Sequence, residues 1–360
     1  MADLKDVYNS HFIDALADAL GRVDLFFNRE VFFACIKQGD WDSLALKQRI
    51  RRVSSAMQAG VNKPYPEALP LLLDAAPPFK RLTGLVFPDY IEQYGLSFWS
   101  ESMHALAELT VHSTSEFAVR PFLLQDTERM LAQMKEWTKS DNEHVRRLAS
   151  EGARPRLPWG QSIPAFKQDP SPLFPLLDPL LEDDSLYVRK SVANHLNDIS
   201  KTHPHLLIEL VGQRHGRHPH TDWILRHASR TLLKQGDQEV LRLFGYPDSE
   251  HISVRSLMLE EQVIPIGGNL CFSTEIHAGS DTKVRVEYAI DYMKKNGRLS
   301  RKVFHLANTH LAGGQSKKFS RTQSFRNMTT RVHYAGEHRL SILVNGITKE
   351  SVRFHVTNET

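Results

Sequence analysis

The chain has 360 residues, of which 41% are hydrophobic and 24% charged, with a formal net charge of +3. These values are typical of globular proteins, and the length is sufficient for two domains. No apolar run approaches the roughly 20 residues of a membrane span, and we expect no signal peptide because the first residues are polar. The only cysteines, Cys35 and Cys271, exclude a disulfide-rich fold, and we expect two buried free thiols in a reducing cytoplasm.

The charge is unevenly distributed along the chain. Residues 251–360 hold 16 Lys and Arg against 9 Asp and Glu, a net of +7, which leaves −4 for the first 250 residues. Between Tyr292 and Gly336 there is no acidic residue, whereas Lys and Arg recur throughout. A basic face of this kind suits a polyanion, and nucleic acid is the commonest one. On charge alone, a solvated surface is an equal alternative.

Residues 1–250 follow a helical period. Apolar residues recur every three to four positions between residues 7 and 20, between 99 and 109, and between 127 and 137. Strand-like alternation is nearly absent from this part of the chain, so we expect an all-α region.

Three of the helical segments repeat one pattern: a polar start, an apolar residue, an arginine and small residues. The arginines, Arg146, Arg189 and Arg226, lie 43 and 37 residues apart, a spacing typical of HEAT-like helix pairs. Such pairs stack into a solenoid, and a row of arginines on its concave face would meet a long ligand. The alternative is that the arginines form salt bridges between neighbouring repeats. The residues expected as N-caps of these helices are Asp141, Asp183 and Thr221.

From about residue 255 the pattern changes to alternation of apolar and polar residues, which predicts strands. Expected turns are Gly267-Gly268, Asn296-Gly297, Gly313-Gly314 and Asn345-Gly346. The number of runs fits a sandwich of about seven strands. A linker is expected at residues 246–251, where Pro247 and Asp248 end the last helix. The predicted fold is an all-α HEAT-like helical-repeat solenoid (1–250) followed by an all-β immunoglobulin-like sandwich (251–360).

Common catalytic and metal-binding motifs are absent from the sequence. It contains no nucleophile elbow, phosphate loop or zinc-finger spacing. The histidines between His203 and His227 are irregularly spaced and have no cysteine near them, so we expect no metal site and no cofactor. A different stretch stands out: ASEGARPRLPWG (149–160) reads as a helix end followed by a stiff turn, because Pro155 and Pro158 restrict its backbone.

Three stretches together carry a family resemblance: RRLASEGARPRLPW (146–159), YVRKSVANHLNDISKTHP (187–204) and WILRHASRTLLKQG (223–236). The chain resembles the AlkC branch of the HEAT-like-repeat alkylbase DNA glycosylases, over nearly all of its helical half. Its sandwich is similar to the immunoglobulin-like domain of some members. The resemblance implies a monofunctional hydrolase that removes cationic N-alkylated bases from duplex DNA and so initiates base excision repair. It implies 3-methyladenine as substrate, then 3-methylcytosine and 1-methyladenine, with 7-methylguanine least expected.

This chemistry has particular needs. A cationic base is already a good leaving group, so the enzyme need not protonate it. The sugar becomes an oxocarbenium-like cation, which a carboxylate near C1′ and the π face of an aromatic ring would stabilise. By resemblance, Trp159 takes the aromatic position and Asp198 a carboxylate position facing it. We expect Asp198 to serve the sugar cation and the attacking water, with Glu116 and Glu151 as lesion or sugar contacts.

Ion pairing is the simpler explanation for the same carboxylates. Asp198 could pair with Arg189 or Lys201, and Glu151 could pair with Arg147 one helical turn away.

Two sets of basic residues are expected to bind DNA phosphates. The set on the helical half is Arg147, Arg154, Arg156, Arg189, Lys190 and Arg226. The second set lies in the glycine-rich segment 313–326, expected to be a loop that contacts the duplex, and consists of Lys317, Lys318, Arg321 and Arg326. Trp223 is a further aromatic residue, for which helix packing is at least as good an explanation as a DNA contact.

Two non-enzymatic interpretations remain open. A HEAT-type scaffold binds a protein on its concave face, and an architectural protein binds DNA without catalysis. A protein scaffold needs neither the basic C-terminal part nor the clustering of arginine, tryptophan and carboxylates. We expect a monomer that binds double-stranded DNA and no membrane, in the bacterial cytoplasm with the nucleoid.

Overall fold

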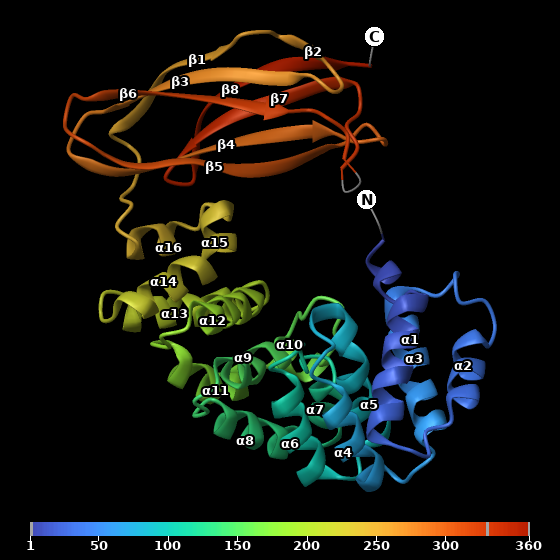
Figure 1. The fold of residues 1–360 in the computed structure, drawn as a ribbon. Helices are drawn as coiled ribbons and strands as arrows, with labels where there is room; N and C mark the ends of the chain where they lie inside the picture. Colours follow the sequence, from blue (N-terminus) through green and yellow to red (C-terminus); the bar gives the residue numbers. More distant parts are fainter. Residues whose placement is uncertain (1–2, 329–330, 359–360) are drawn as a thin grey trace. The chain divides into compact units, whose positions relative to one another are not determined.

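The structure, a computed structural model, describes residues 3–328 and 331–358 (Figure 1). The helices precede residue 244 and the long strands follow residue 251, which confirms the predicted change from helix to strand. The chain forms two compact units, Met1–Thr202 with His218–Ile224, and His203–Arg217 with Leu225–Thr360. No helix of the described residues is long and apolar enough to cross a membrane.

The first unit is helical. Its helices are α1 (Ser10–Val23), α2 (Arg29–Lys37), α3 (Leu46–Val61), α4 (Tyr65–Ala75), α5 (Val86–Tyr94), α6 (Trp99–Leu109), α7 (Val119–Gln125), α8 (Thr127–Trp137), α9 (Glu143–Gly152), α10 (Pro164–Gln168), α11 (Phe174–Leu177) and α12 (Leu186–Ser200), followed by the start of α14 (Pro219–Ala228). Two of the segments predicted from apolar periodicity coincide with α6 and α8, and the first overlaps α1, although Val7 lies in the preceding 3-10 helix Leu4–Val7. The apolar residues of these helices share one face, and that face is buried. On α1, for example, Phe12, Leu16 and Leu20 are buried.

The predicted N-caps of α9 and α12 are wrong by one and two residues, and Thr221 is not a cap. The cap of α9 is Asn142, whose side chain accepts a hydrogen bond from the amide of His144, and the cap of α12 is Ser185. Thr221 lies inside α14, buried, and donates to the carbonyl of Leu181. Asp141 and Asp183 each have a polar neighbour that is better placed to reach the first free amides.

Two of the repeated arginines have one structural role. Arg146 Nη1 donates to the carbonyls of Ser140 and Asp141, six and five residues before it, at 2.9 and 3.0 Å. Arg189 Nη1 donates at the same offsets to Asp183 and Asp184, at 2.8 Å each. Arg146 also binds the Asp183 carboxylate, 2.7 Å from Nε, and so joins the two repeats. The sequence repeat is therefore a structural one, and these arginines brace helix starts.

The second unit contains α13 (Pro204–Arg214), α15 (Arg230–Gln235), α16 (Gln238–Leu243) and a β-sandwich. The strands are β1 (Ile252–Leu259), β2 (Val263–Pro265), β3 (Asn269–Ala278), β4 (Thr282–Met293), β5 (Leu299–Leu311), β6 (Ser316–Ser324), β7 (Gly336–Val344) and β8 (Ile347–Thr357). One sheet has the order β1-β3-β6 and the other β2-β8-β7-β4-β5. All pairs are antiparallel except β2 with β8. Phe272, Tyr288 and Phe325 are among the buried residues of the sandwich core.

The expected linker at residues 246–251 is packed rather than loose. Tyr246 is buried, and the carbonyl of Pro247 accepts a hydrogen bond from Asn345 Nδ2 at 2.8 Å. Asn345 and Gly346 form the predicted β7–β8 turn, with φ values of 46° and 80°. A Cβ on Gly346 would lie 2.6 Å from Cα of Gly236, at the end of α15, so only glycine permits this contact.

Two further predictions need correction. Most of segment 313–326 is the edge strand β6, paired with β3 along its whole length, and only its start is a turn. Cys35 on α2 and Cys271 on β3 are free but partly exposed, not buried.

Candidate active site

Helix α9 places two charged side chains on one face. Arg147 and Glu151 lie one turn apart, and their charged atoms approach to 3.7 Å. Arg147 contacts Glu116 more closely, at 2.8 Å, and Glu116 also accepts a hydrogen bond from Thr114 Oγ1 at 2.9 Å. Arg147 therefore bridges two carboxylates from different parts of the chain.

Arg154, just after α9, bridges the next two carboxylates. Its Nη1 lies 2.5 Å from Glu151 Oε1, and its Nε and Nη2 each lie 2.9 Å from Asp198 Oδ2. Lys201 binds the other oxygen of Asp198 at 2.9 Å. Burial alone would lower the pKa of Arg154, but Glu151 and Asp198 outweigh it, and the pKa is raised. Charges thus alternate along a network of Glu116, Arg147, Glu151, Arg154, Asp198 and Lys201, of which Lys201 is exposed.

Two residues of helix α12 hold α9 and its Glu151 in place. Ser191 Oγ donates to Glu151 Oε2 at 2.6 Å, so Glu151 is held through both of its oxygens. His195 is fully buried, its Nδ1 lies 2.9 Å from the carbonyl of Ser150, and burial lowers its pKa to about 3. A neutral His195 therefore fixes the last turn of α9 without adding charge beside Arg154.

A cavity of about 440 Å³ opens onto part of the network. Glu116 and Glu151 line it, together with Trp159 and Tyr187. Asp198 is 2% exposed and is not among the lining residues, because Arg154 lies between it and the cavity. Arg81, Arg147 and Arg154 line it as well. The carboxylates and the indole are the groups of this lining that would stabilise a cation.

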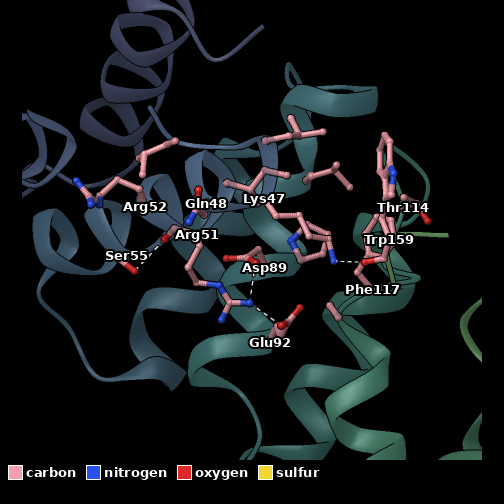
Figure 2. Close-up of a pocket in the computed structure, with 16 residues that line it drawn as sticks. Lys47, Gln48, Arg51, Arg52, Ser55, Asp89, Glu92, Thr114, Phe117 and Trp159 are labelled. Carbon is pink, nitrogen blue, oxygen red and sulfur yellow. Dashed lines mark hydrogen bonds and ion pairs between the residues drawn. The ribbon is translucent and has the colours of Figure 1, made fainter. Parts of the chain in front are cut away.

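A buried arginine holds the turn that carries Trp159. Arg120 is 1% exposed and donates to the carbonyls of Gly152, at 2.7 Å, of Arg154, at 3.1 Å, and of Gln161. These carbonyls lie at both ends of the turn, and α9 ends at Gly152 as predicted. Lys47 of α3 donates to the carbonyl of Trp159, whose side chain is 57% exposed (Figure 2).

Backbone strain coincides with this cavity. Four non-glycine residues of the described chain have positive φ, and two of these are asparagines, which tolerate it. The other two, Arg81 at 56° and Trp159 at 62°, both line the cavity. Strained residues of this kind cluster at functional sites, since the fold must hold them in place.

Comparisons with known proteins show the family of the chain. A family model described as "DNA alkylation repair enzyme" matches residues 108–232, and one described as "Uncharacterised protein YhaZ, C-terminal Ig-like domain" matches residues 253–358. The chain is 53% identical to "Uncharacterized protein YhaZ" of Bacillus subtilis (strain 168), over 99% of this chain and 100% of that protein. It is also 40% identical to the solved "Pseudomonas fluorescens alkylpurine DNA glycosylase AlkC bound to DNA containing an abasic site analog". That match has a TM-score of 0.95 and covers 99% of this chain and 100% of the other.

The chain belongs to the AlkC family of DNA alkylation repair enzymes. The match to an AlkC structure extends over both halves of the chain, including the immunoglobulin-like domain.

Within this AlkC-type fold, the predicted site residues separate into groups. Glu116, Glu151 and Trp159 lie together at the cavity, whereas Asp198 lies behind it and pairs with Lys201, not with Arg189. Arg147 and Arg154 were predicted to bind phosphates. Their side chains are only 15% and 10% exposed, and both are occupied by carboxylates.

The other predicted phosphate ligands of the helical half also differ in availability. Arg189 braces the start of α12, and Arg226 donates to Tyr246 Oη at 2.5 Å. Arg156 and Lys190 are exposed, so of the predicted set they are the ones best able to reach a phosphate. Arg81, exposed at the cavity, is an additional cation that sequence reasoning missed.

Two aromatic residues at the cavity were also missed. Arg147 lies 5.0 Å from the ring centroid of Tyr187, a cation–π contact, and Phe117 lines the cavity next to Glu116. Tyr187 is the first residue of the stretch 187–204 that carries the family resemblance, and Phe117 directly follows Glu116. Both residues could therefore have been proposed from the sequence.

The basic residues of the sandwich that were predicted to bind phosphates are exposed. Lys317, Lys318 and Arg321 project from edge strand β6, and Arg326 follows it. The acid closest to this set is Glu275, 4.0 Å from Lys318. No group of three or more His, Cys, Asp or Glu within residues 3–328 and 331–358 is placed to hold a metal ion.

Proposed function

We propose that the chain is a monofunctional DNA glycosylase that hydrolyses the N-glycosidic bond of cationic N-alkylated bases in duplex DNA. The observation that carries the proposal is the meeting of Glu116, Glu151 and Trp159 at one cavity. The 40% identity to an AlkC glycosylase, solved with DNA containing an abasic site analogue, supports it over the whole chain. Such an enzyme would work on DNA in the bacterial cytoplasm.

The mechanism follows from the charges at the cavity. When the glycosidic bond breaks, its electron pair leaves with the base, which becomes neutral, and the positive charge passes to the sugar. Glu151 and Glu116 stabilise this cation through their negative charges, and the face of Trp159 stabilises it through its π electrons. A water oxygen then bonds to C1′, and Glu151 accepts the proton and later releases it to solvent.

The arginines act on the carboxylates rather than on the substrate in this proposal. Arg147 and Arg154 offset the cost of burying several negative charges, and they fix the carboxylate positions before substrate arrives. We assign Asp198 to the same task, because it orients Arg154 and has no access to the cavity. This replaces the role expected for Asp198 from the sequence, which placed it at the sugar.

Positive charge on the lesion defines the substrate class. We propose 3-methyladenine as the main substrate, and 3-methylcytosine and 1-methyladenine as further ones, because each carries a cationic ring in DNA. None of them requires a proton from the enzyme in order to leave.

The decisive experiment measures release of methylated bases from methylated duplex DNA. The wild type is expected to release 3-methyladenine, and Glu151→Gln is expected to lower the single-turnover rate by about 10²- to 10³-fold. Asp198→Asn should have a smaller effect than Glu151→Gln. Binding to a duplex with an abasic site analogue, measured in parallel, should be retained by both variants.

The opposite outcomes are informative. No base release by the wild type, with DNA binding intact, would leave a DNA-binding protein without catalysis. Loss of both would favour the protein scaffold. A larger loss in Asp198→Asn than in Glu151→Gln would restore Asp198 as the carboxylate at the sugar.

A further inference from the structure

A second cavity, of about 420 Å³, adjoins the one that holds Glu116 and Glu151 (Figure 2). Helix α3 forms one wall, and residues of α5 form the other. The two cavities share four lining residues, Leu85, Thr114, Phe117 and Trp159. The second cavity is therefore one side chain away from the proposed position of the sugar. Its volume lies within the roughly 300–1,000 Å³ range of small-molecule sites.

The walls of this cavity combine apolar side chains with charged ones, and its acids are paired with an arginine. Ile50, Pro88 and Ala118 are buried side chains at its surface. The carboxylates Asp89 and Glu92 also line it, but Arg51 Nη2 binds both, at 3.0 and 2.5 Å (Figure 2). Arg51 thus offsets both acids, and Lys47 and Arg52 are further positive charges in the lining.

A fixed positive charge lies where the two cavities meet. Lys47 Nζ is 4.6 Å from the ring centroid of Phe117, and it donates to the carbonyl of Trp159. Both partners line both cavities. Lys47 therefore repels a cation that moves from the first cavity towards the second, whereas a neutral molecule meets no such barrier.

The charge on the base changes during the proposed glycosylase reaction. The inference therefore rests on the proposed function. Before hydrolysis the alkylated ring is cationic and attached to the sugar. Afterwards the electron pair of the broken bond resides on the ring, which is free, flat and neutral. We infer that the second cavity receives the released base, admitting the neutral product and rejecting the cationic substrate.

The test is equilibrium dialysis with radiolabelled 3-methyladenine, in the presence of excess duplex containing an abasic site analogue. The DNA occupies the sugar position, so base bound under these conditions lies elsewhere. One equivalent should bind to the wild type, and 3,9-dimethyladeninium, which keeps the substrate's positive charge, should bind at least about tenfold more weakly. No binding at millimolar concentration, equal binding of the cation, or displacement of the base by the DNA would each overturn the inference.

A matched pair of variants locates the site. Leu46→Trp adds bulk at the start of α3, where Leu46 lines the cavity, and should weaken base binding at least about tenfold. Leu124→Trp makes the same change on α7, at a 43% exposed residue outside the cavity, and should leave binding unchanged. Equal effects of the two would contradict the inference. Should Leu46→Trp not fold, Ser55→Met, further along the same wall, replaces it.

Failure of the inference differs from failure of the proposed function. Excision without base binding removes the second cavity as a product site and leaves the glycosylase. Base binding that depends on Leu46 without excision leaves a nucleobase site and removes the glycosylase.

Discussion

The basic residues of the helical unit and those of the sandwich differ in what they are free to do. Around the cavity, Arg154 is buried, Arg147 is mostly buried, and each binds two carboxylates. On strand β6, Lys317 and Arg321 are exposed and have few acids near them. In the sequence the two groups look alike, since both are cations in a chain expected to bind DNA. The difference shows that availability to a phosphate depends on the partners that folding brings, and not on the number of cations.

The comparison predicts its largest effect on stability. Arg154→Met should cost about 3–5 kcal/mol of unfolding free energy, because it leaves Glu151 and Asp198 buried without their partner. Arg321→Met, the same change on the exposed edge of β6, should stay within about 0.5 kcal/mol. Urea unfolding followed by circular dichroism measures both. Similar losses in the two variants would contradict the distinction between the regions.

Asp89 allows a test of burial by pH. Burial raises its pKa from 3.8 to about 6, against the opposing effects of Ser54 and Arg51, while Glu92 adds to the rise. A carboxyl group with a raised pKa favours the folded state below pH 4, and that contribution is lost as the pH rises through 6. Asp89→Asn should therefore gain stability relative to the wild type between pH 4 and 7, by up to about 3 kcal/mol.

The prediction is checked by measuring the free energy of unfolding at each pH. The control is Asp18→Asn, since Asp18 forms an exposed ion pair with Arg29. We expect it to change stability by less than about 1 kcal/mol at any pH in that range. If the free energies of unfolding of the wild type and of Asp89→Asn change in parallel with pH, burial does not raise the pKa of Asp89.

The two most exposed tryptophans, Trp159 and Trp223, allow a catalytic role to be distinguished from a packing role. Trp159→Ala should slow base excision by up to roughly 30-fold, since a desolvated cation–π contact contributes up to about 2 kcal/mol. Trp223, 36% exposed, has the Arg189 guanidinium 6.0 Å from its ring centroid and does not line either cavity beside Trp159. Trp223→Ala should therefore excise at nearly the wild-type rate. Equal rates for the two variants would remove Trp159 from the mechanism.

Local features of the fold could be predicted from the sequence. Apolar periodicity located α1, α6 and α8, and alternation located the sandwich, because each depends on residues close in the chain. The caps were misplaced because Asp141 is followed by Asn142, and Asp183 by two more cap-forming residues. Only the geometry of the helix start decides which side chain reaches the free amides.

Ion pairs between residues that are far apart in the sequence could not be predicted. Arg147 was correctly paired with Glu151, one turn away, but its shorter contact is with Glu116, from another segment. Arg154 and Asp198 are 44 residues apart, and nothing local indicates that they meet. Segment 313–326 looked like a loop because an edge strand is paired on one side only and tolerates many polar residues.

The smallest predicted effect concerns the exposed half of the comparison. Replacing Lys317, Lys318 and Arg321 together by glutamine should weaken binding to duplex DNA about tenfold at physiological salt. The slope of log affinity against log salt should fall by roughly 2.7, at about 0.9 for each phosphate that is no longer neutralised. Arg353→Gln is the control, because Arg353 is exposed on β8 but lies 3.2 Å from Glu337. An unchanged slope in the triple variant would mean that exposure without nearby acids is insufficient to identify a phosphate ligand, and that the β6 cations only solvate the sandwich.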